Sequence, residues 1–301
     1  MSIREDASSE AGVSTSFDVA ALQRIVASDL AGRKASSACR ELYWEAALDL
    51  CLAAKSTAIV TGFFIASVEA SETDGPPGSV VLGRALQGLG GEVRLVTDER
   101  NSSVLSACSR AVKGPEVLTP DRTGLDAAGS PDLLIFLERP GRAADGRYYN
   151  MNGVDVSSVV SPLDDMALSA MERGVSVLGI GDGGNEAGMG LLYGELVKLL
   201  PEYAPFLSCV PSTVCLPVDV SNWGGYALAA LLSASCGRWL GLSAGEEEHM
   251  LEAALAAGAV DGGLRTATLS VDCFPLVQLD QISSQIRDWY RGNVHNTSEK
   301  A

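Results

Sequence analysis

Short apolar runs alternate along the chain with segments whose apolar residues recur at helical spacing. Four runs predict buried strands, at residues 57–65, 92–97, 131–137 and 175–180. The helical spacing predicts helices at residues 17–30, 39–54, 79–89, 101–112, 163–173, 190–200, 220–240, 246–257 and 278–290. Strands that alternate with helices are typical of a parallel sheet. We therefore expect an α/β fold, a three-layer sandwich with a mostly parallel sheet covered by helices on both faces.

The same alternation indicates a single domain. No Pro/Ser-rich linker, block of charge or internal repeat interrupts it between residues 17 and 292. Residues 1–16 are polar, Ser-rich and acidic, and they predict a disordered tail. Residues 293–301 are expected to form a second tail.

Four polar loops stand at the ends of predicted strands or the starts of predicted helices, at residues 72–78, 138–153, 181–190 and 220–226. The loop at residues 181–190 contains the most glycine. It follows the run Val175–Ile180 and carries Asp182, Asn185 and Glu186 among its glycines. Open α/β sheets bind their ligands at the carboxyl ends of parallel strands. We therefore expect these loops to gather around one cavity at that edge of the sheet.

The side chains in these loops favour a small, polar, carboxylate-bearing ligand. They comprise carboxylates (Glu72, Asp74, Asp145, Asp182, Glu186), guanidinium groups (Arg139, Arg142, Arg147), amides (Asn150, Asn185, Asn222) and aromatic rings (Tyr148, Tyr149, Trp223, Tyr226). Arginine binds carboxylates in a bidentate fork, and clustered carboxylates bind hard divalent cations. Any one such loop could instead hold ordinary turn and capping residues. Both histidines, His249 and His295, lie outside the loops, which argues against a Ser-His or Cys-His catalytic pair.

Net charge and cysteine content narrow the range of partners. The formal net charge is −16 and the sequence pI about 4.5, which argues against nucleic acid or an anionic membrane as a partner. No apolar run reaches the ~18 residues of a membrane span. The seven cysteines are widely spaced and form no CxxC pair, so we expect a reducing compartment, the cytoplasm, with the mitochondrial matrix as the alternative.

One motif admits a different function. Gly179, Gly181 and Gly184 match the G-x-G-x-x-G pattern of dinucleotide-binding proteins. Asp182 and Glu186 place negative charge where a pyrophosphate needs positive potential, so this alternative is the weaker one.

Taken together, these loops resemble the D-glutamate cyclase family, in its C-terminal catalytic domain. The resemblance extends over about residues 17–280 and is carried by the stretches Thr61–Phe63, Glu72–Gly78, Arg139–Gly146, Tyr149–Met151, Gly179–Glu186, Gly188–Gly190, Ser221–Tyr226 and Gly258–Gly262. Ala187 departs from it, because family members usually carry a branched residue there. The segment Gly32-Arg33-Lys34 also lacks the family's fuller Asn-Arg-Gly.

The resemblance implies that D-glutamate is converted to 5-oxo-D-proline and water with the help of a divalent cation, Mn²⁺ or alternatively Mg²⁺. Under this hypothesis three carboxylates, Asp74, Asp182 and Glu186, supply the metal ligands and the proton-transfer groups. Arg139 and Arg142 hold the α-carboxylate. The remaining candidate substrate-binding residues are Asn150, Asn185, Gly183, Gly184 and Asn222. Which carboxylate is acid, base or ligand stays open, as does homo-oligomerisation.

A non-catalytic binder of acidic amino acids is the main alternative, because it could use the same pocket without turning its ligand over. Formation of 5-oxoproline separates the two functions.

Overall fold

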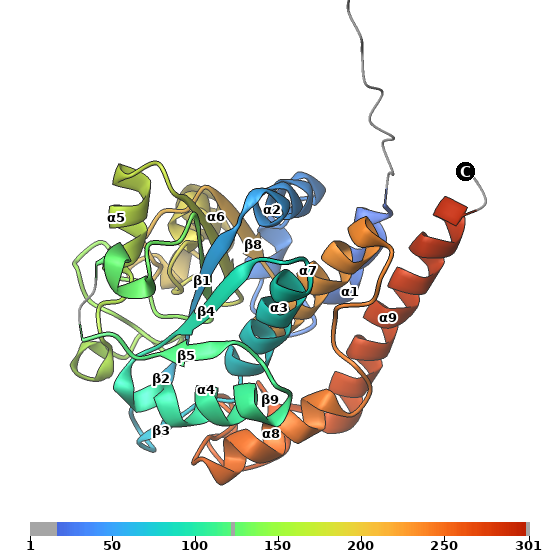
Figure 1. Ribbon diagram of the computed structural model, residues 1–301. Helices are drawn as coiled ribbons and strands as arrows, with labels where there is room; N and C mark the ends of the chain where they lie inside the picture. The colour runs from blue at the N-terminus through green and yellow to red at the C-terminus, as the bar shows by residue number, and fades with distance from the viewer. Residues whose placement is uncertain (1–16, 122–123, 299–301) are drawn as a thin grey trace, which may run out of the picture.

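A six-stranded, fully parallel sheet forms the centre of the computed structural model, which describes residues 17–121 and 124–298 (Figure 1). The predicted tail at residues 1–16 lies outside the described residues. The strands are β1 (Ser56–Thr61), β4 (Glu92–Val96), β5 (Glu116–Leu118), β6 (Leu133–Leu137), β7 (Ser176–Gly181) and β8 (Val214–Pro217). They lie in the order β5-β4-β1-β6-β7-β8, and every neighbouring pair is parallel.

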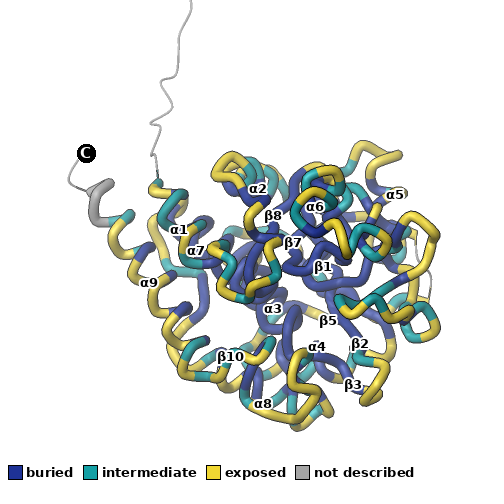
Figure 2. Tube along the Cα trace, turned by 180° about the vertical axis from the view of Figure 1, so that it is seen from behind, coloured by how far each residue is buried: buried dark blue, intermediate teal, exposed yellow. Residues whose placement is uncertain are grey.

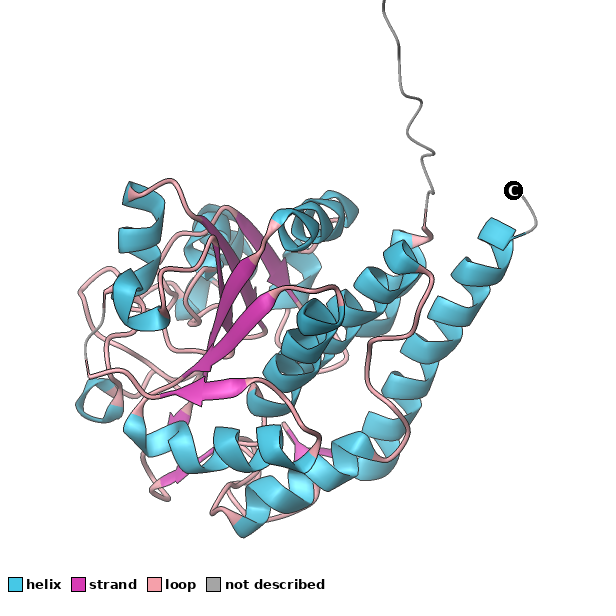
Figure 3. Ribbon diagram, viewed as in Figure 1, coloured by secondary structure: helices cyan, strands magenta, loops and turns pink. Residues whose placement is uncertain are grey.

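Helices cover both faces of this sheet, which confirms the predicted three-layer α/β sandwich (Figure 3). The α-helices are α1 (Val19–Val26), α2 (Glu41–Ala53), α3 (Pro76–Gly88), α4 (Glu99–Ala111), α5 (Asp165–Glu172), α6 (Tyr193–Leu199), α7 (Ser221–Cys236), α8 (Glu246–Ala256) and α9 (Leu276–Ser298). Helices α3 and α7 lie on one face with α1, α2, α4, α8 and α9 around them. On the opposite face lies α5, with α6 beside β8.

Alternation along each strand builds the two core layers. In β1, Ile59 packs toward α3 and α7, whereas Ala58 and Val60 pack toward α5. Successive side chains of a strand point to opposite faces, so a strand covered on both sides must be apolar at every position. This requirement explains why the strands appear as continuous apolar runs in the sequence. The sheet is buried throughout the centre of the molecule (Figure 2).

The order of the strands places a crevice beside β1. The chain runs from β1 through α3 to β4 and through α4 to β5, and then returns to β6 on the other side of β1. The loops that leave β1 and β6 therefore diverge at their carboxyl ends. Such a switch point is where open α/β sheets bind ligands.

Several elements differ from the sequence prediction. The predicted strand 57–65 is divided, because β1 ends at Thr61 and the next residue, Gly62, turns the backbone with a φ of +109°. Two short strands then pair as an antiparallel hairpin, β2 (Phe64–Ile65) with β3 (Ala70–Ser71). Strands β5 and β8, of three and four residues, were not predicted, and neither were β9 (Ser270–Val271) and β10 (Phe274–Pro275). Helix α9 continues to Ser298, beyond the predicted end at residue 290.

Helices α3 and α7 cross with their backbones in close contact. A Cβ atom added at Gly225 of α7 would lie 2.6 Å from the carbonyl oxygen of Gly78 in α3, so only glycine allows this separation. The contact fixes the start of α7 against the loop before α3. That loop and the N-terminus of α7 both belong to the candidate site.

No α-helix within residues 17–121 and 124–298 has the combination of length and apolar content needed to cross a membrane.

Candidate functional site

A cavity of about 240 Å³ opens at the carboxyl edge of the sheet. It brings together loops that follow β1, β6 and β7 with a segment near the C-terminus at residues 262–272. The polar side chains in its wall are Arg33, Ser67, Glu72, Glu138, Asn150, Asn152, Asp182, Asn185, Glu186, Arg265 and Asp272. The cavity is smaller than the ~300–1,000 Å³ typical of sites for drug-sized ligands, so it suits a small molecule.

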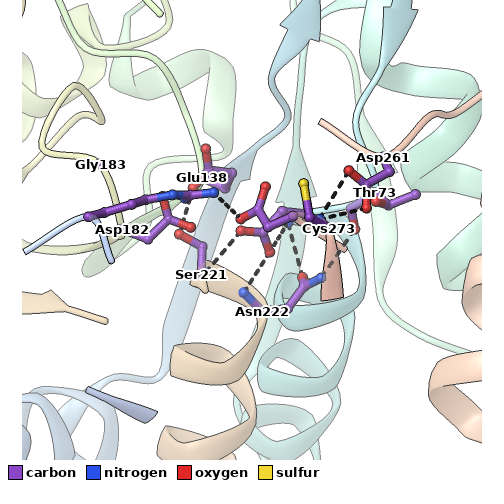
Figure 4. A network of polar contacts seen from close by, with 12 residues as sticks. Thr73, Glu138, Asp182, Gly183, Ser221, Asn222, Asp261 and Cys273 are labelled. Atoms are coloured by element: carbon purple, nitrogen blue, oxygen red, sulfur yellow. Dashed lines mark hydrogen bonds and ion pairs between the residues drawn. The ribbon is translucent and has the colours of Figure 1, made fainter. Parts of the chain in front are cut away.

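Three buried carboxylates lie close together at this cavity, and two of them, Glu138 and Asp182, belong to its wall. Asp74, Glu138 and Asp182 each offer an oxygen atom, and these atoms lie within 4.8 Å of one another. All three side chains are buried. Figure 4 shows Glu138 and Asp182 beside Ser221, the first residue of α7. Two of the three predicted metal ligands, Asp74 and Asp182, are therefore neighbours, and the third carboxylate of the group is Glu138.

Asp74 is held by the N-terminus of α7. Its Oδ1 accepts a hydrogen bond from the backbone N–H of Asn222 at 2.8 Å, and its Oδ2 accepts one from Ser221 at 2.9 Å. The first N–H groups of a helix have no partner within the helix, and the helix dipole favours a negative charge there. The start of α7 thus fixes both oxygens of Asp74.

Glu138 follows β6 in a left-handed backbone conformation, with φ of +47°. Its Oε2 accepts a hydrogen bond of 2.6 Å from the hydroxyl of Ser221. The same helix start therefore positions two of the three carboxylates. A left-handed conformation is uncommon for a residue with a side chain, and such positions concentrate at functional sites.

Asp182 follows β7 and has one bound and one free oxygen. Its Oδ1 pairs with the guanidinium of Arg33, which also contacts Asp272 Oδ2 at 2.9 Å. Its Oδ2 is buried and has no hydrogen-bond partner within the described residues. An unpartnered carboxylate oxygen in a buried site is costly unless a ligand, ion or proton satisfies it.

Burial of several acids in one place raises their pKa values. Desolvation raises the pKa of Glu72, Asp74 and Glu138 well above the usual range, and the neighbouring carboxylates add to the effect. The pKa of Asp182 is also raised by burial, although Arg33 opposes the change. Burial likewise raises the pKa of Asp272 to about 7 against the opposing effect of Arg33. Buried acids with raised pKa values hold their protons to a higher pH than exposed carboxyl groups do, and such groups concentrate at functional sites.

Glu186 stabilises its own loop. Its Oε1 accepts a hydrogen bond from the N–H of Gly183 at 2.8 Å, and its Oε2 accepts one from Gly184 at 2.8 Å. The side chain is fully buried and lies outside the group of three close carboxylates. Glu186 therefore occupies the backbone N–H groups that a dinucleotide phosphate would need.

Arg139 and Arg142 do not line the cavity. Arg139 is buried and donates to Asp98 Oδ2 at 2.6 Å and to the carbonyl oxygen of Ser161 at 2.6 Å. Arg142 donates from Nε to Asp164 Oδ2 at 2.9 Å. The structure thus gives both arginines intramolecular partners outside the cavity wall.

Two of the predicted amides reach the cavity, and one does not. Asn185 donates to the carbonyl oxygen of Tyr149 at 2.8 Å, while its Oδ1 has no hydrogen-bond partner in the described part of the chain. Asn150 lines the cavity, but its Oδ1 accepts from backbone N–H groups of its own loop. The amide of Asn222 lies beneath the site, where its Oδ1 accepts from the N–H of Gly78 at 2.7 Å.

Sequence reasoning missed four residues of the site, namely Glu138, Arg33, Asp272 and Arg265. Glu138 immediately follows a buried strand, and that position was a usable signal. The other three come from segments without a strong periodic pattern, and Arg33 reaches Asp182 across 149 positions of sequence. For these three no periodic pattern gave a signal, and only the family's Asn-Arg-Gly at residues 32–34 drew attention to the segment of Arg33.

The oxygen atoms of these three carboxylates suit a divalent cation. Carboxylate oxygens are the ligands that Mg²⁺ and Mn²⁺ prefer, and Asp182, a member of the group of three, has a buried Oδ2 without a hydrogen-bond partner in the described residues. Among the described residues, Asp74, Glu138 and Asp182 form the group of acidic, histidine or cysteine side chains that lie close enough together to hold an ion.

Comparison with known proteins identifies a family for this chain. Residues 22–287 match the family model described as "D-glutamate cyclase-like, C-terminal". The chain is 36% identical over 246 residues to the human protein "D-glutamate cyclase, mitochondrial". The match covers 74% of this chain and 40% of the human protein, so the chain spans less than half the length of that relative.

Proposed function

Because the chain belongs to the D-glutamate cyclase-like family, we propose that it converts D-glutamate to 5-oxo-D-proline and water. In this reaction a C–N bond forms between the amine and the γ-carboxyl carbon. A C–O bond of the same carboxyl group breaks, and its oxygen leaves as water. The observation that carries the proposal is the group of Asp74, Glu138 and Asp182 at the buried end of a cavity sized for a small molecule.

We assign the cation to these three carboxylates, with Mn²⁺ or Mg²⁺ as the ion. When bound, it would polarise the γ-carboxyl group, which is otherwise a poor electrophile. This assignment replaces Glu186 by Glu138, since Glu186 already accepts three hydrogen bonds from its own loop.

The protein's own residues would prepare the reacting atoms. Glu72 lines the cavity, and its Oε1 has no hydrogen-bond partner among the described residues. Two protons must pass from the substrate ammonium to the departing oxygen for it to leave as water, and the raised pKa of Glu72 suits it to carry them in turn. Asn185 Oδ1 would accept a hydrogen bond from the same ammonium. A cavity that folds the substrate back on itself makes the attack intramolecular, which can lower the barrier by ~7–11 kcal/mol.

The test is product formation by the purified chain. We expect 5-oxo-D-proline from D-glutamate in the presence of Mn²⁺ or Mg²⁺, and a large loss of rate after chelation, measured by chiral chromatography. Asp182→Asn should lower the rate by ~100-fold or more, because it removes a carboxylate used for the cation or for proton transfer. The matched control is Asp145→Asn, which changes an exposed carboxylate outside the cavity and should retain the wild-type rate.

Two outcomes would reject the proposal in different ways. Thermal stabilisation by D-glutamate without any 5-oxoproline would identify a binding protein. Stabilisation by a nucleotide, with no response to D-glutamate, would identify the dinucleotide alternative. The carboxylate of Glu186 on the glycine loop speaks against this second outcome.

A further inference from the structure

A second part of the cavity wall comes from the segment between α8 and α9, and Asp261 fixes its shape. The Asp261 side chain is fully buried. Its Oδ1 accepts from the N–H of Leu264 at 2.7 Å, and its Oδ2 accepts from the N–H of Cys273 at 2.9 Å. Its carbonyl oxygen accepts from the N–H of Arg265 at 2.7 Å. The loop is therefore closed on itself through one aspartate.

This segment is also attached to the loop that carries Asp74. The hydroxyl of Thr73 donates to the carbonyl oxygen of Ser270 at 2.8 Å, and the N–H of Thr73 donates to Val260 at 2.9 Å. Figure 4 shows Thr73, Asp261 and Cys273 together on one side of the acidic group. The segment is thus held against the site.

Arg265 is the guanidinium that this loop presents to the cavity. It lines the cavity, its residue is exposed, and its φ is +57°. No ion pair or side-chain hydrogen bond of Arg265 occurs within residues 17–121 and 124–298. Arg33, the other arginine in the wall, already contacts Asp182 and Asp272. A left-handed backbone at a residue with a side chain is held only where its surroundings enforce it, and such positions cluster at ligand sites.

Charge shows what Arg265 is suited to bind. The remainder of the wall carries five carboxyl groups and one other guanidinium, that of Arg33. The carboxyl groups belong to Glu72, Glu138, Asp182, Glu186 and Asp272. These groups would repel a carboxylate of the ligand in this part of the cavity, so such a carboxylate needs a positively charged side chain beside it. Arginine supplies the positive charge and binds a carboxylate through two parallel hydrogen bonds.

The proposed reaction decides which carboxylate that is. The γ-carboxyl group reacts and belongs at the buried end, beside Asp182 and Glu138. The α-carboxylate keeps its charge and ends outside the five-membered ring of the product, so it points toward the open end. We propose that Arg265 is a specificity-determining residue that binds the substrate's α-carboxylate. This inference rests on the proposed function.

A pair of substrates tests the inference directly. D-Isoglutamine has the same amine and γ-carboxyl group as D-glutamate but carries an α-carboxamide. The wild-type protein, supplied with Mn²⁺, should prefer D-glutamate in kcat/KM. Arg265→Gln should reduce that preference by about 10- to 100-fold, the size expected when a charge-assisted hydrogen bond is lost. The loss should fall mainly on KM for D-glutamate, and Arg265→Lys should restore part of it.

Arg100→Gln is the matched control. Arg100 lies on α4 with its guanidinium 5.2 Å from the centre of the Phe64 ring, next to the cavity but not in its wall. The variant removes the same charge from an acidic protein, so it reports on long-range attraction alone. We expect it to leave the preference for D-glutamate over D-isoglutamine unchanged.

Binding measured by calorimetry on the same proteins keeps the two proposals separate. If the wild type forms 5-oxoproline and Arg265→Gln keeps the full preference, the role of Arg265 is refuted and the proposed function stands. If the wild type binds D-glutamate without turnover and Arg265→Gln loses the preference in binding, the proposed function fails and the role of Arg265 stands. If D-glutamate neither binds nor reacts, both are refuted.

Discussion

The buried carboxyl group of Glu247 makes the stability of the fold depend on pH. Glu247 lies on α8 and accepts a hydrogen bond of 3.1 Å from the hydroxyl of Tyr226 on α7, while its Oε2 has no hydrogen-bond partner among the described residues. Burial raises its pKa from the ordinary value of 4.5 to about 7. The hydrogen bond from Tyr226 opposes that change, as does Arg287 of α9, whereas Asp280 of α9 adds to it.

The direction of the pH dependence follows from proton binding. Between pH 4.5 and 7 the folded protein retains a proton on Glu247 that the unfolded chain has released. The contribution of Glu247 to stability is therefore fully present below pH 4.5 and is lost as the pH rises through about 7. A difference of about 2.5 between the two pKa values corresponds to roughly 3 kcal/mol.

Glu247→Gln removes this dependence because the amide does not ionise. Its free energy of unfolding, minus that of the wild type, should rise by roughly 3 kcal/mol between pH 4.5 and 8. Urea unfolding at a series of pH values measures the difference, and the buried amide contributes only a constant offset. Glu248→Gln, at the exposed neighbouring position, should give a flat difference. A flat difference for Glu247→Gln as well would refute the reasoning.

Three further substitutions test the contacts that support the site. Gly225→Ala should cost ~1–3 kcal/mol in urea unfolding, because the added methyl group meets the backbone of α3; Gly194→Ala, with open space at its Cβ, should cost nothing. Arg139→Met should cost ~3–5 kcal/mol, because it leaves a buried carboxylate unpaired; Arg147→Met, which breaks only exposed pairs, should change stability by less than ~1 kcal/mol. Glu186→Gln should speed amide hydrogen exchange in its own glycine loop, because the neutral side chain cannot accept every hydrogen bond there; unchanged exchange would contradict the role assigned to that carboxylate.

The sequence predicted the layers of this fold well because their signal is strong and local. A strand buried on both faces must be apolar at every position, and residues 133–137 meet that condition without interruption. Strands β5 and β8 have too few residues for such a run. The hairpin after Gly62 could not be separated from β1, since Phe64 and Ile65 continue the apolar pattern.

The partners of the polar residues were harder to predict than the strands, because those partners come from distant parts of the sequence. Arg139 and Arg142 follow a strand at the ligand-binding edge of the sheet, where an arginine for a substrate would also stand. What distinguishes them is the position of Asp98 and Asp164, which reach these arginines from α4 and from the start of α5. Arg265 illustrates the opposite case, because its local sequence carries no signal and only the closure of the loop on Asp261 brings it into the cavity wall.

The charge balance of the cavity connects the two proposals. Four buried carboxyl groups, Glu72, Asp74, Glu138 and Asp182, and the partly buried Asp272 share the site with the guanidinium of Arg33, which contacts two of them. Burial raises the pKa values of these groups, which favours their uncharged forms, and D-glutamate would bring two further carboxylates. A cation at the buried end would compensate the reacting carboxyl group, and Arg265 would compensate the one that does not react. Since coupling between two ligands is reciprocal, a cation that strengthens D-glutamate binding must itself bind more tightly, by the same factor, when D-glutamate is present. Under the two proposals an acidic cavity would select an acidic substrate, because neither the cation nor D-glutamate would bind well without the other.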